Sequence, residues 1–483
     1  MTVADPDLWG HLRFGQDIWT SGDVAHTDPY SYLTAGQAWI NHEWLAELSF
    51  FWVYNHLGAS GLISLKVLLC IAILAAIFNA LLHYGFSYAR ASIVTIWVTL
   101  LILPGVSSIR PQIFTYLFFL LLLLILQRHR HAPAKLIWSI PIIFSFWVNI
   151  HGGFLAGMAV LLVWMAIRVV SAIMKLDRSW RQELPHIFTV LFALAALFLN
   201  PYGAGLLRFL LTPETVMRPE IMEWNSLEIF SNYGGFLLAL IVFATVYVWL
   251  STRRREPAEL VILASVSAAA LLSFRHGPLL GLAIPVLTGE HMADVWHRWM
   301  AYPAKQERKF SKPFIVSWAA LYVCLMGAAA LTHFRSIRLD PISTGEYPVE
   351  AVALLKRSGI QGNMAVFFNW GEYALWHLAP EIRVSIDGRR ETVYSDTVYQ
   401  ENLSFSAGTS GWNTLLTKYP TTLALVSRNY PVFDRMVEEP GWVQVYADDL
   451  CGLFAKEKLS ALKRLKIVAS EPRNWKPMEL SFP

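Results

Sequence analysis

The chain has 483 residues, of which 55% are hydrophobic and only 15% are charged, and its mean hydropathy is +0.43. Because a soluble domain carries roughly 25% charged residues, this composition excludes an ordinary soluble protein and is typical of a polytopic membrane protein. The net charge of +4 is small and the basic residues stand in short loops, so it indicates membrane topology and not nucleic-acid binding. The three cysteines do not suggest a disulfide framework.

The first 59 residues are not a simple loop. Two acids, Asp5 and Asp7, stand just before an aromatic helix, and residues 27–31 have the composition of a turn. Residues 43–56 are amphipathic and aromatic, which predicts an interfacial helix on the outer leaflet. We therefore expect residues 1–59 to form an extracytoplasmic loop that contains such a helix.

Apolar runs of about 20 residues predict membrane-spanning helices. We expect about ten of them within residues 60–333, in a polytopic α-helical domain. The predicted spans are 60–83, 89–108, 110–127, 135–150, 153–174, 184–200, 232–251, 257–273, 277–293 and 313–333.

The orientation follows from the basic loops. Lys and Arg residues cluster after the third, fifth, seventh and ninth spans, which places these loops in the cytoplasm by the positive-inside rule. Residues 1–59, 201–231 and 334–483 are then outside. No span precedes Asp5 to carry the N-terminal region across the membrane, so we expect an upstream helix that this chain lacks.

Residues 334–483 change in character and alternate between helix and strand patterns, which predicts a small extracytoplasmic α/β domain. The predicted strands are 364–369, 382–387 and 422–426, the predicted helices are 371–377, 414–418 and 432–438, and 442–455 is a predicted hairpin.

Unusual polar clusters between the spans fall almost entirely on the outer side. Asp5 and Asp7 can supply a general base toward a hydroxyl acceptor, or hold a divalent metal such as Mg²⁺ or Mn²⁺. The alternative is that they cap a helix. His42 and Glu43 can supply an acid, a base or a metal ligand, or Glu43 can simply begin the interfacial helix.

Two outer arginines are candidates for phosphate binding. Arg110, followed by Pro111 and Gln112, lies at the outer end of the third predicted span, and Arg275 with His276 lies at the outer end of the eighth. A guanidinium fits a phosphate or pyrophosphate, although snorkelling to ordinary headgroups is the alternative.

Three further segments are less specific. His151, before Gly152 and Gly153, can bind a sugar or phosphate, or be a satisfied turn histidine. Residues 200–203 read as a helix stop, and the acids and Trp224 of 213–231 suit sugar recognition or a solvated loop. In the C-terminal region, residues 369–373 and 386–390 have a glycine after the end of a predicted strand. Side chains at such strand ends lie at the edge of the domain, where they either close a cavity at the membrane or simply form turns.

These motifs together resemble a large group of bacterial membrane proteins over nearly the whole chain. The group carries Asp-x-Asp-x-x-Trp-His-Leu, His-Glu-Trp-Leu, Arg-Pro-Gln, Trp-Gly-x-Tyr-Leu and Ile-Asp-Gly-Arg. Here Trp9-Gly10 replaces the usual aromatic pair before His11. The group is similar to the GT-C glycosyltransferase superfamily, whose members use polyprenyl-phosphate or polyprenyl-pyrophosphate sugars outside the membrane. The resemblance matches Asp5 and Asp7 to the acidic motif of the first external loop.

The resemblance implies a membrane glycosyltransferase of the bacterial inner (plasma) membrane, with an outward-facing site. Asp7 is the expected base, with Asp5 as second candidate, while Arg110 and Arg275 stabilise the leaving phosphate. His11, His42, Glu43, Gln112, His151 and His276 complete the expected binding residues. The expected partners are a polyprenyl-linked sugar donor, a glycan, lipid or protein acceptor, and membrane lipids. A lipid or polysaccharide transporter and a non-catalytic assembly protein remain as alternatives, although no internal repeat favours transport.

Overall fold

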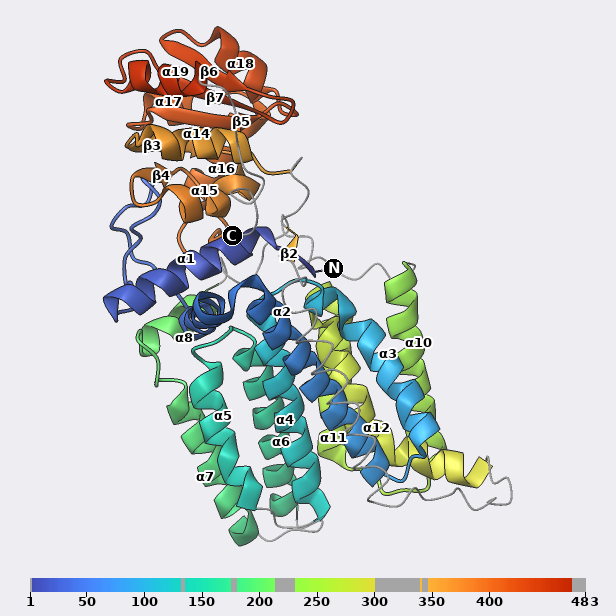
Figure 1. Cartoon of the computed structure of the whole chain (residues 1–483). Coiled ribbons are helices and arrows are strands. Elements are labelled where there is room, and N and C mark those ends of the chain that lie inside the picture. The colour runs from blue at the N-terminus through green and yellow to red at the C-terminus, as the bar shows by residue number, and fades with distance from the viewer. Residues whose placement is uncertain are drawn as a thin grey trace.

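The computed structural model describes residues 2–131, 135–174, 180–212, 231–299, 339–340 and 346–470. Helices of the membrane region form one bundle, helix α1 lies across one end of it, and the C-terminal domain stands beyond α1 (Figure 1). The N-terminal end of the chain also contacts the segment before the C-terminal domain, because strand β1 (Thr2–Val3) pairs in parallel with β2 (Leu339–Asp340).

The helices of the bundle lie over each predicted span except 313–333, which falls outside the described residues. They are α2 (Trp44–His83), α3 (Tyr88–Val106), α4 (Gln112–His131), η1 (Lys135–Ser139), α5 (Ile140–Trp147), α6 (Phe154–Ile173), α7 (Trp180–Ala196), α8 (Ala204–Leu210), α10 (Asn232–Leu250), α11 (Pro257–Leu272), η3 (Phe274–His276) and α12 (Gly277–Trp299). In the described part of the chain, 5 helices are long and apolar enough to cross a membrane. A membrane protein is thus supported, while the number of ten spans stays a prediction.

Helix α2 joins two predicted elements. The predicted interfacial helix over 43–56 and the first predicted span are its two arms, and they meet at Gly58, whose φ is +63°. Glycine adopts this backbone conformation without the steric cost that a Cβ would add, so the chain can turn here between an amphipathic and an apolar arm. A helix over this segment is confirmed, beginning at Trp44, while its place at the membrane interface stays a prediction.

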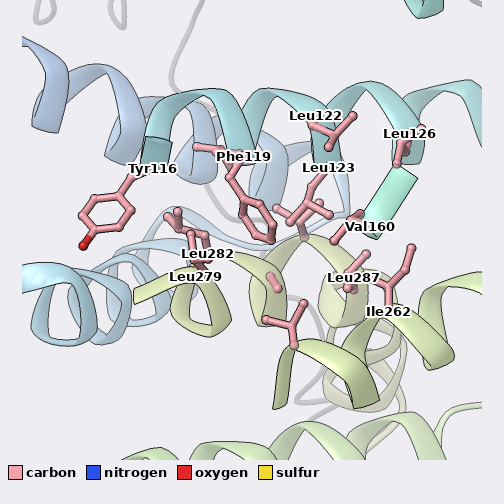
Figure 2. Packing of buried hydrophobic residues seen from close by; sticks show 14 of the residues in the cluster. Tyr116, Phe119, Leu122, Leu123, Leu126, Val160, Ile262, Leu279, Leu282 and Leu287 are labelled. Carbon is pink, nitrogen blue, oxygen red and sulfur yellow. The ribbon is translucent and has the colours of Figure 1, made fainter. Parts of the chain in front are cut away.

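The bundle is held by large apolar side chains that interdigitate between helices. Phe119 and Leu123 of α4 face Leu282 and Leu287 of α12, and Val160 of α6 closes the same layer (Figure 2). Phe119, Leu123 and Leu282 have no exposed surface. Because lipid is as apolar as these side chains, their contribution here comes from close packing.

The C-terminal domain contains a five-stranded sheet of order β4-β3-β5-β7-β6, in which β4, β3 and β5 are parallel and β7 and β6 form an antiparallel hairpin. The strands are β3 (Gly362–Val366), β4 (Ile382–Val384), β5 (Leu423–Ser427), β6 (Trp442–Ala447) and β7 (Cys451–Lys456). The helices are α14 (Val349–Ser358), α15 (Gly371–Leu378), α16 (Asp396–Ala407), α17 (Thr414–Thr417), α18 (Val432–Glu438) and α19 (Leu462–Ser470), with η4 (Phe368–Trp370) before α15.

Each predicted strand, helix and hairpin of this region has its counterpart, with bounds shifted by a few residues. Helices α14, α16 and α19 were not predicted. The signals for α16 were Ser395, whose side chain accepts from the Val398 N–H as an N-cap, and Gly408 at its end. Cys70 and Cys451 are free in the described part of the chain, and Cys324 lies outside it.

The segment between α1 (Pro6–Ser21) and α2 docks on the edge of the sheet. Val384 of β4 donates its N–H to the Tyr30 carbonyl at 3.3 Å and accepts from the Tyr32 N–H at 3.2 Å. The turn predicted over 27–31 is confirmed, because the Asp28 carboxylate accepts from the Tyr30 N–H at 2.9 Å. This N-terminal segment therefore extends the C-terminal sheet.

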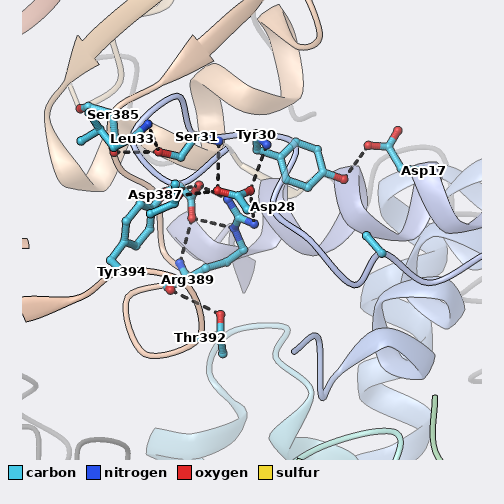
Figure 3. A network of polar contacts seen from close by, with 12 residues as sticks. Asp17, Asp28, Tyr30, Ser31, Leu33, Ser385, Asp387, Arg389, Thr392 and Tyr394 are labelled. Atoms are coloured by element: carbon cyan, nitrogen blue, oxygen red, sulfur yellow. Dashed lines mark hydrogen bonds and ion pairs between the residues drawn. The ribbon is translucent and has the colours of Figure 1, made fainter. Parts of the chain in front are cut away.

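A buried ionic network fixes the same contact (Figure 3). The Arg389 guanidinium donates to both oxygens of Asp387, at 2.9 and 2.7 Å, and to Asp28 at 2.8 Å. The rings of Phe14 and Trp39 surround the same cation, with Trp39 at 4.6 Å. Since Arg389, Asp387 and Asp28 are all buried, each charge needs the others as partners.

Candidate functional site

A cavity of about 590 Å³ lies where the end of the bundle, α1 and the C-terminal domain meet. It is lined by Pro6, Asp7, His11, Phe14, Trp39, Asn41, His42, Glu43, Glu47, Arg110, Pro111, Gln112, His151, Arg275, Phe368, Asn369, Glu372, Gly388, Arg389, Arg390, Glu391, Thr392 and Tyr399. Most of the residues singled out in the sequence thus gather in one place, although they come from segments far apart in the chain.

Asp5 and Asp7 meet Arg110 at the edge of this cavity. Arg110 donates from Nε and Nη2 to the two oxygens of Asp5, at 2.7 and 2.9 Å, and its Nη2 lies 3.3 Å from Asp7 Oδ2. The Asp5 side chain is 10% exposed and that of Asp7 is 38% exposed. Asp5 is therefore paired with Arg110 and largely buried, while the Asp7 side chain faces the cavity.

The local sequence explains this division. Asp5 is the N-cap of α1, and its side chain accepts from the Asp7 N–H at 3.1 Å, so the capping alternative holds for Asp5. Pro6 follows at the first helical position, where its missing N–H costs nothing. Asp7 lies in the first turn, where a negative charge interacts favourably with the helix dipole.

The surroundings of Asp7 alter its acidity. Burial beneath the C-terminal domain raises the pKa of Asp7 to about 6, and the negative charge of Asp5 adds to the rise, while Arg110 opposes it. A carboxylate with a pKa near 6 is ionised at neutral pH yet basic enough to accept a proton, which suits a general base.

Glu43 lies between two histidines. Its Oε1 is 3.8 Å from His42 Nε2 and 3.7 Å from His151 Nε2. Burial raises the pKa of Glu43 to about 7, with His11 opposing the shift, and burial lowers the pKa of His42 to about 4. At neutral pH His42 is thus uncharged, and Glu43 can exchange a proton.

The turn at 151–153 orients His151. The Gly153 N–H donates to His151 Nδ1 at 2.9 Å, and Thr115 Oγ1 lies 2.9 Å from the same nitrogen. The proton of neutral His151 is therefore assigned to Nε2, on the side of Glu43. A Cβ at Gly153 would lie 2.6 Å from Thr115 Oγ1, so the glycine makes this close approach possible.

His11 is held from the other side of the cavity. Its Nδ1 lies 3.4 Å from Glu47 Oε1, and the Asn41 amide donates to the second oxygen of Glu47. Burial opposes protonation of His11, but the hydrogen bond to Glu47 and the nearby acids outweigh it and raise its pKa. His11 is consequently a candidate for a positive charge near Asp7.

A second cavity of about 360 Å³ continues from the first between helix ends of the bundle. The residues His42, Glu43, Gln112, His151, Arg275 and Glu391 line both cavities. Its further walls are largely apolar and include Tyr116, Leu155 and Leu279, and His276 also lines it. A polar chamber therefore opens into a narrower apolar one, with Arg275 at the junction.

The residues around Asp5 and Asp7 do not fit a metal ion. Among the described residues, no group of three or more His, Cys, Asp or Glu side chains is placed to hold one. In addition, the guanidinium of Arg110 lies against both carboxylates, where a cation bridging them would have to stand. The predicted loop 213–231, with its acids and Trp224, lies outside the described residues except for Ser231.

The fold is similar to that of three solved structures. The oligosaccharyltransferase from Archaeoglobus fulgidus in its apo form gives a TM-score of 0.56 at 12% identity, over 88% of this chain and 66% of that chain. The archaeal AglB in complex with an inhibitory peptide and a dolichol-phosphate gives 0.53 at 12% identity, with the same coverage. ArnT from Cupriavidus metallidurans bound to undecaprenyl phosphate gives 0.50 at 11% identity, over 94% of both chains.

The chain has a GT-C-like fold. At such low identity the similarity shows the fold alone, and the chain spans just under two thirds of the archaeal oligosaccharyltransferase. No protein-family model matches the chain, and no curated protein matches it. The GT-C-like fold confirms the architecture that the motifs suggested.

The larger cavity contains residues that the sequence analysis did not choose as site candidates. They are Glu47, Glu372, Arg389, Arg390 and Glu391, which all line the larger cavity. The segments 369–373 and 386–390 were singled out as distinctive, so a signal existed for most of them. What the sequence could not supply was their distance from Asp7, which depends on how the C-terminal domain docks.

Proposed function

We propose that this protein transfers a sugar from a polyprenyl-phosphate or polyprenyl-pyrophosphate donor to a hydroxyl acceptor. The observation that carries the proposal is Asp7, a carboxylate with a pKa near 6 that faces a cavity lined by many polar side chains. The cavity continues into an apolar chamber between the helix ends. A polyprenyl phosphate has a charged phosphate, which suits the first cavity, and a hydrocarbon chain, which suits the adjoining apolar chamber. The similar folds bound to dolichol-phosphate and to undecaprenyl phosphate support this assignment.

In the proposed step, Asp7 accepts the proton of the acceptor hydroxyl. The hydroxyl oxygen forms a bond to the anomeric carbon of the donor sugar, and the bond from that carbon to the phosphate oxygen breaks. The electron pair leaves with the phosphate, which departs as polyprenyl phosphate or pyrophosphate. Attack from the face opposite the phosphate would invert the anomeric configuration.

The arginines have different roles in this proposal. Arg110 holds Asp5 and Asp7 in place, since its donors are directed to their carboxylates. Arg275 lies at the junction of the two cavities, where the leaving phosphate would pass from the polar to the apolar chamber. Preorganised cations at such a point stabilise the charge that develops on a leaving group. His151 and Gln112 line the same junction and would orient the phosphate oxygens.

Replacing Arg275 tests the donor site. Arg275→Ala should weaken binding of undecaprenyl phosphate roughly 10- to 100-fold, because a charge-assisted hydrogen bond to phosphate contributes about 1.5–3 kcal/mol. The measurement is displacement of the radiolabelled lipid from purified protein in detergent. Arg208→Ala, at an exposed arginine of α8, is the matched control and should bind normally. Equal weakening in both variants would mean that the effect is not specific to the junction.

The pH dependence of transfer tests the base. Asp7 must be ionised to accept a proton, so the turnover number should rise with pH through about 6. Arg110 lowers the pKa of Asp7, so Arg110→Gln should move this acidic limb to higher pH. Arg428→Gln, an exposed change on the C-terminal domain, should leave it in place. An acidic limb that is identical in all three proteins would assign the ionisation to another group.

A further inference from the structure

A second buried carboxylate reaches the cavity from the C-terminal domain. Glu372 lies in the first turn of α15 and is 6% exposed. Its Oε2 accepts from the Gly10 N–H of α1 at 3.1 Å. Gly10 stands three residues after Asp7, so Glu372 lies about one helical turn from the proposed base.

The loop after β4 brings the two carboxylates together. A Cβ at Gly388 would lie 2.5 Å from Glu372 Oε1 and 2.8 Å from Asp7 Oδ1. Both oxygens therefore border the space beside one glycine, and their separation cannot exceed the sum of these two distances. A Cβ at Gly10 would in turn lie 2.2 Å from Glu372 Oε2. Because Gly10 and Gly388 have no side chain, the Glu372 carboxylate can occupy the space that a Cβ at either position would fill.

The surroundings of Glu372 favour its neutral form. Asp7 faces it from α1, Asp387 and Arg389 face it from the loop after β4, and Tyr347 approaches from the segment before α14. Burial raises the pKa of Glu372 well above its usual value, Asp7 and Asp387 add to the rise, and Arg389 opposes it. A neutral carboxylic acid has one O–H donor. Because Oε2 accepts from Gly10, that proton belongs on Oε1, beside Asp7.

We infer that Glu372 binds the acceptor, by donating a hydrogen bond to a hydroxyl next to the one that Asp7 deprotonates. This rests on the proposed transferase function and names the acceptor class: a sugar, with neighbouring hydroxyls, and not a molecule with a single hydroxyl. The base Asp7 and the donor Glu372 border the same small space beside Gly388. Because each can form an O–H···O bond of about 2.5–3.0 Å, the pair fits two neighbouring hydroxyl oxygens of one acceptor. The aromatic side chains of Phe368 and Tyr399, which line the same cavity, suit a pyranose ring.

The test removes, in turn, the neighbouring hydroxyl of the acceptor and the side chain of Glu372 that would donate a hydrogen bond to it. Proteoliposomes receive a panel of undecaprenyl-phosphate hexoses and pentoses as donors. The acceptors are methyl hexopyranosides, their single deoxy analogues and a serine-containing peptide. In the wild-type protein, loss of the neighbouring hydroxyl should raise the acceptor KM roughly 3- to 10-fold. In Glu372→Ala the deoxy analogue and the parent glycoside should have the same KM, because the partner of that hydroxyl is gone.

Two further variants separate binding from folding. Glu372→Gln keeps a donor at this position and should retain part of the difference between the two acceptors. Glu381→Gln, at an exposed glutamate of the C-terminal domain, should behave as wild type. A deoxy penalty in Glu372→Ala as large as in the wild type would overturn the inference, as would transfer to the peptide and to no glycoside. The transferase proposal fails separately, if Asp7→Asn retains full transfer to any acceptor.

Discussion

Asp7→Asn is expected to lower the turnover number roughly 10²- to 10⁴-fold, the contribution that a positioned general base makes to a proton transfer. Asparagine has the same shape and can keep the contact with Arg110, but it accepts no proton at neutral pH. The donor should still bind, because Arg275 lines the second cavity and Asp7 does not. Transfer kinetics and lipid binding, measured on the same preparation, check both statements.

Two neighbouring changes serve as comparisons for this prediction. Asp23→Asn alters an exposed acid beyond the end of α1 and should leave turnover unchanged. Asp5→Asn keeps an N-cap but removes the negative charge that pairs with Arg110, so it should act on the position of Asp7 and reduce turnover less than Asp7→Asn does. If Asp5→Asn were the more damaging change, Asp5 and not Asp7 would be the better candidate for the base.

Arg389→Met should destabilise the contact between the C-terminal domain and the N-terminal segment by about 3–5 kcal/mol, because it leaves two buried carboxylates without their cation. Asp387 has no exposed surface and Asp28 is 1% exposed, so neither can recover its hydration in place. The loop that contains Asp387 and Arg389 also contains Gly388 and Glu391, which line the cavity. This wall of the cavity should therefore become less ordered in the variant. The expected result is a lower denaturation midpoint together with reduced transfer.

Arg428→Met is the matched control for this change. Arg428 is exposed on the C-terminal domain and donates to the Asp448 carbonyl, so its loss should change the free energy of unfolding by no more than about 0.5 kcal/mol. Limited trypsin digestion would show whether the domain contact opens before the whole protein unfolds. An Arg389→Met protein with wild-type stability and turnover would mean that the ionic network does not hold the site together.

The sequence predicted the parts of this molecule that depend on local pattern. Apolar runs located the helices of the bundle, and alternation located the strands around Met364 and Leu423. The amphipathic aromatic pattern after Glu43 predicted the first arm of α2, but its turn at Gly58 was not predicted, because one glycine in an apolar run is an ambiguous signal. Helix α14 is only 10 residues long, a length at which periodicity alone decides little.

The site was predicted in part for the same reason. Asp7, Arg110 and His151 stood out as polar groups at the ends of apolar runs, and such groups are costly unless they are used. The pairing of Arg389 with Asp28 spans 361 positions in the chain, and no local pattern indicates it. The sequence likewise could not predict that Asp5 pairs with Arg110 while Asp7 faces the cavity, because this depends on the position of Arg110. Long-range docking therefore decided which of the conspicuous residues face the cavity.

The most direct test of the account is the stoichiometry of transfer in proteoliposomes. Mass spectrometry would follow the lipid-linked sugar, the glycosylated acceptor and the free polyprenyl phosphate together. The account predicts that glycosylated acceptor and free lipid phosphate appear one for one, and that both disappear in Asp7→Asn. Donor that binds but stays intact in wild-type protein, whether it remains in place or crosses the bilayer, would contradict a transferase and favour an assembly protein or a transporter.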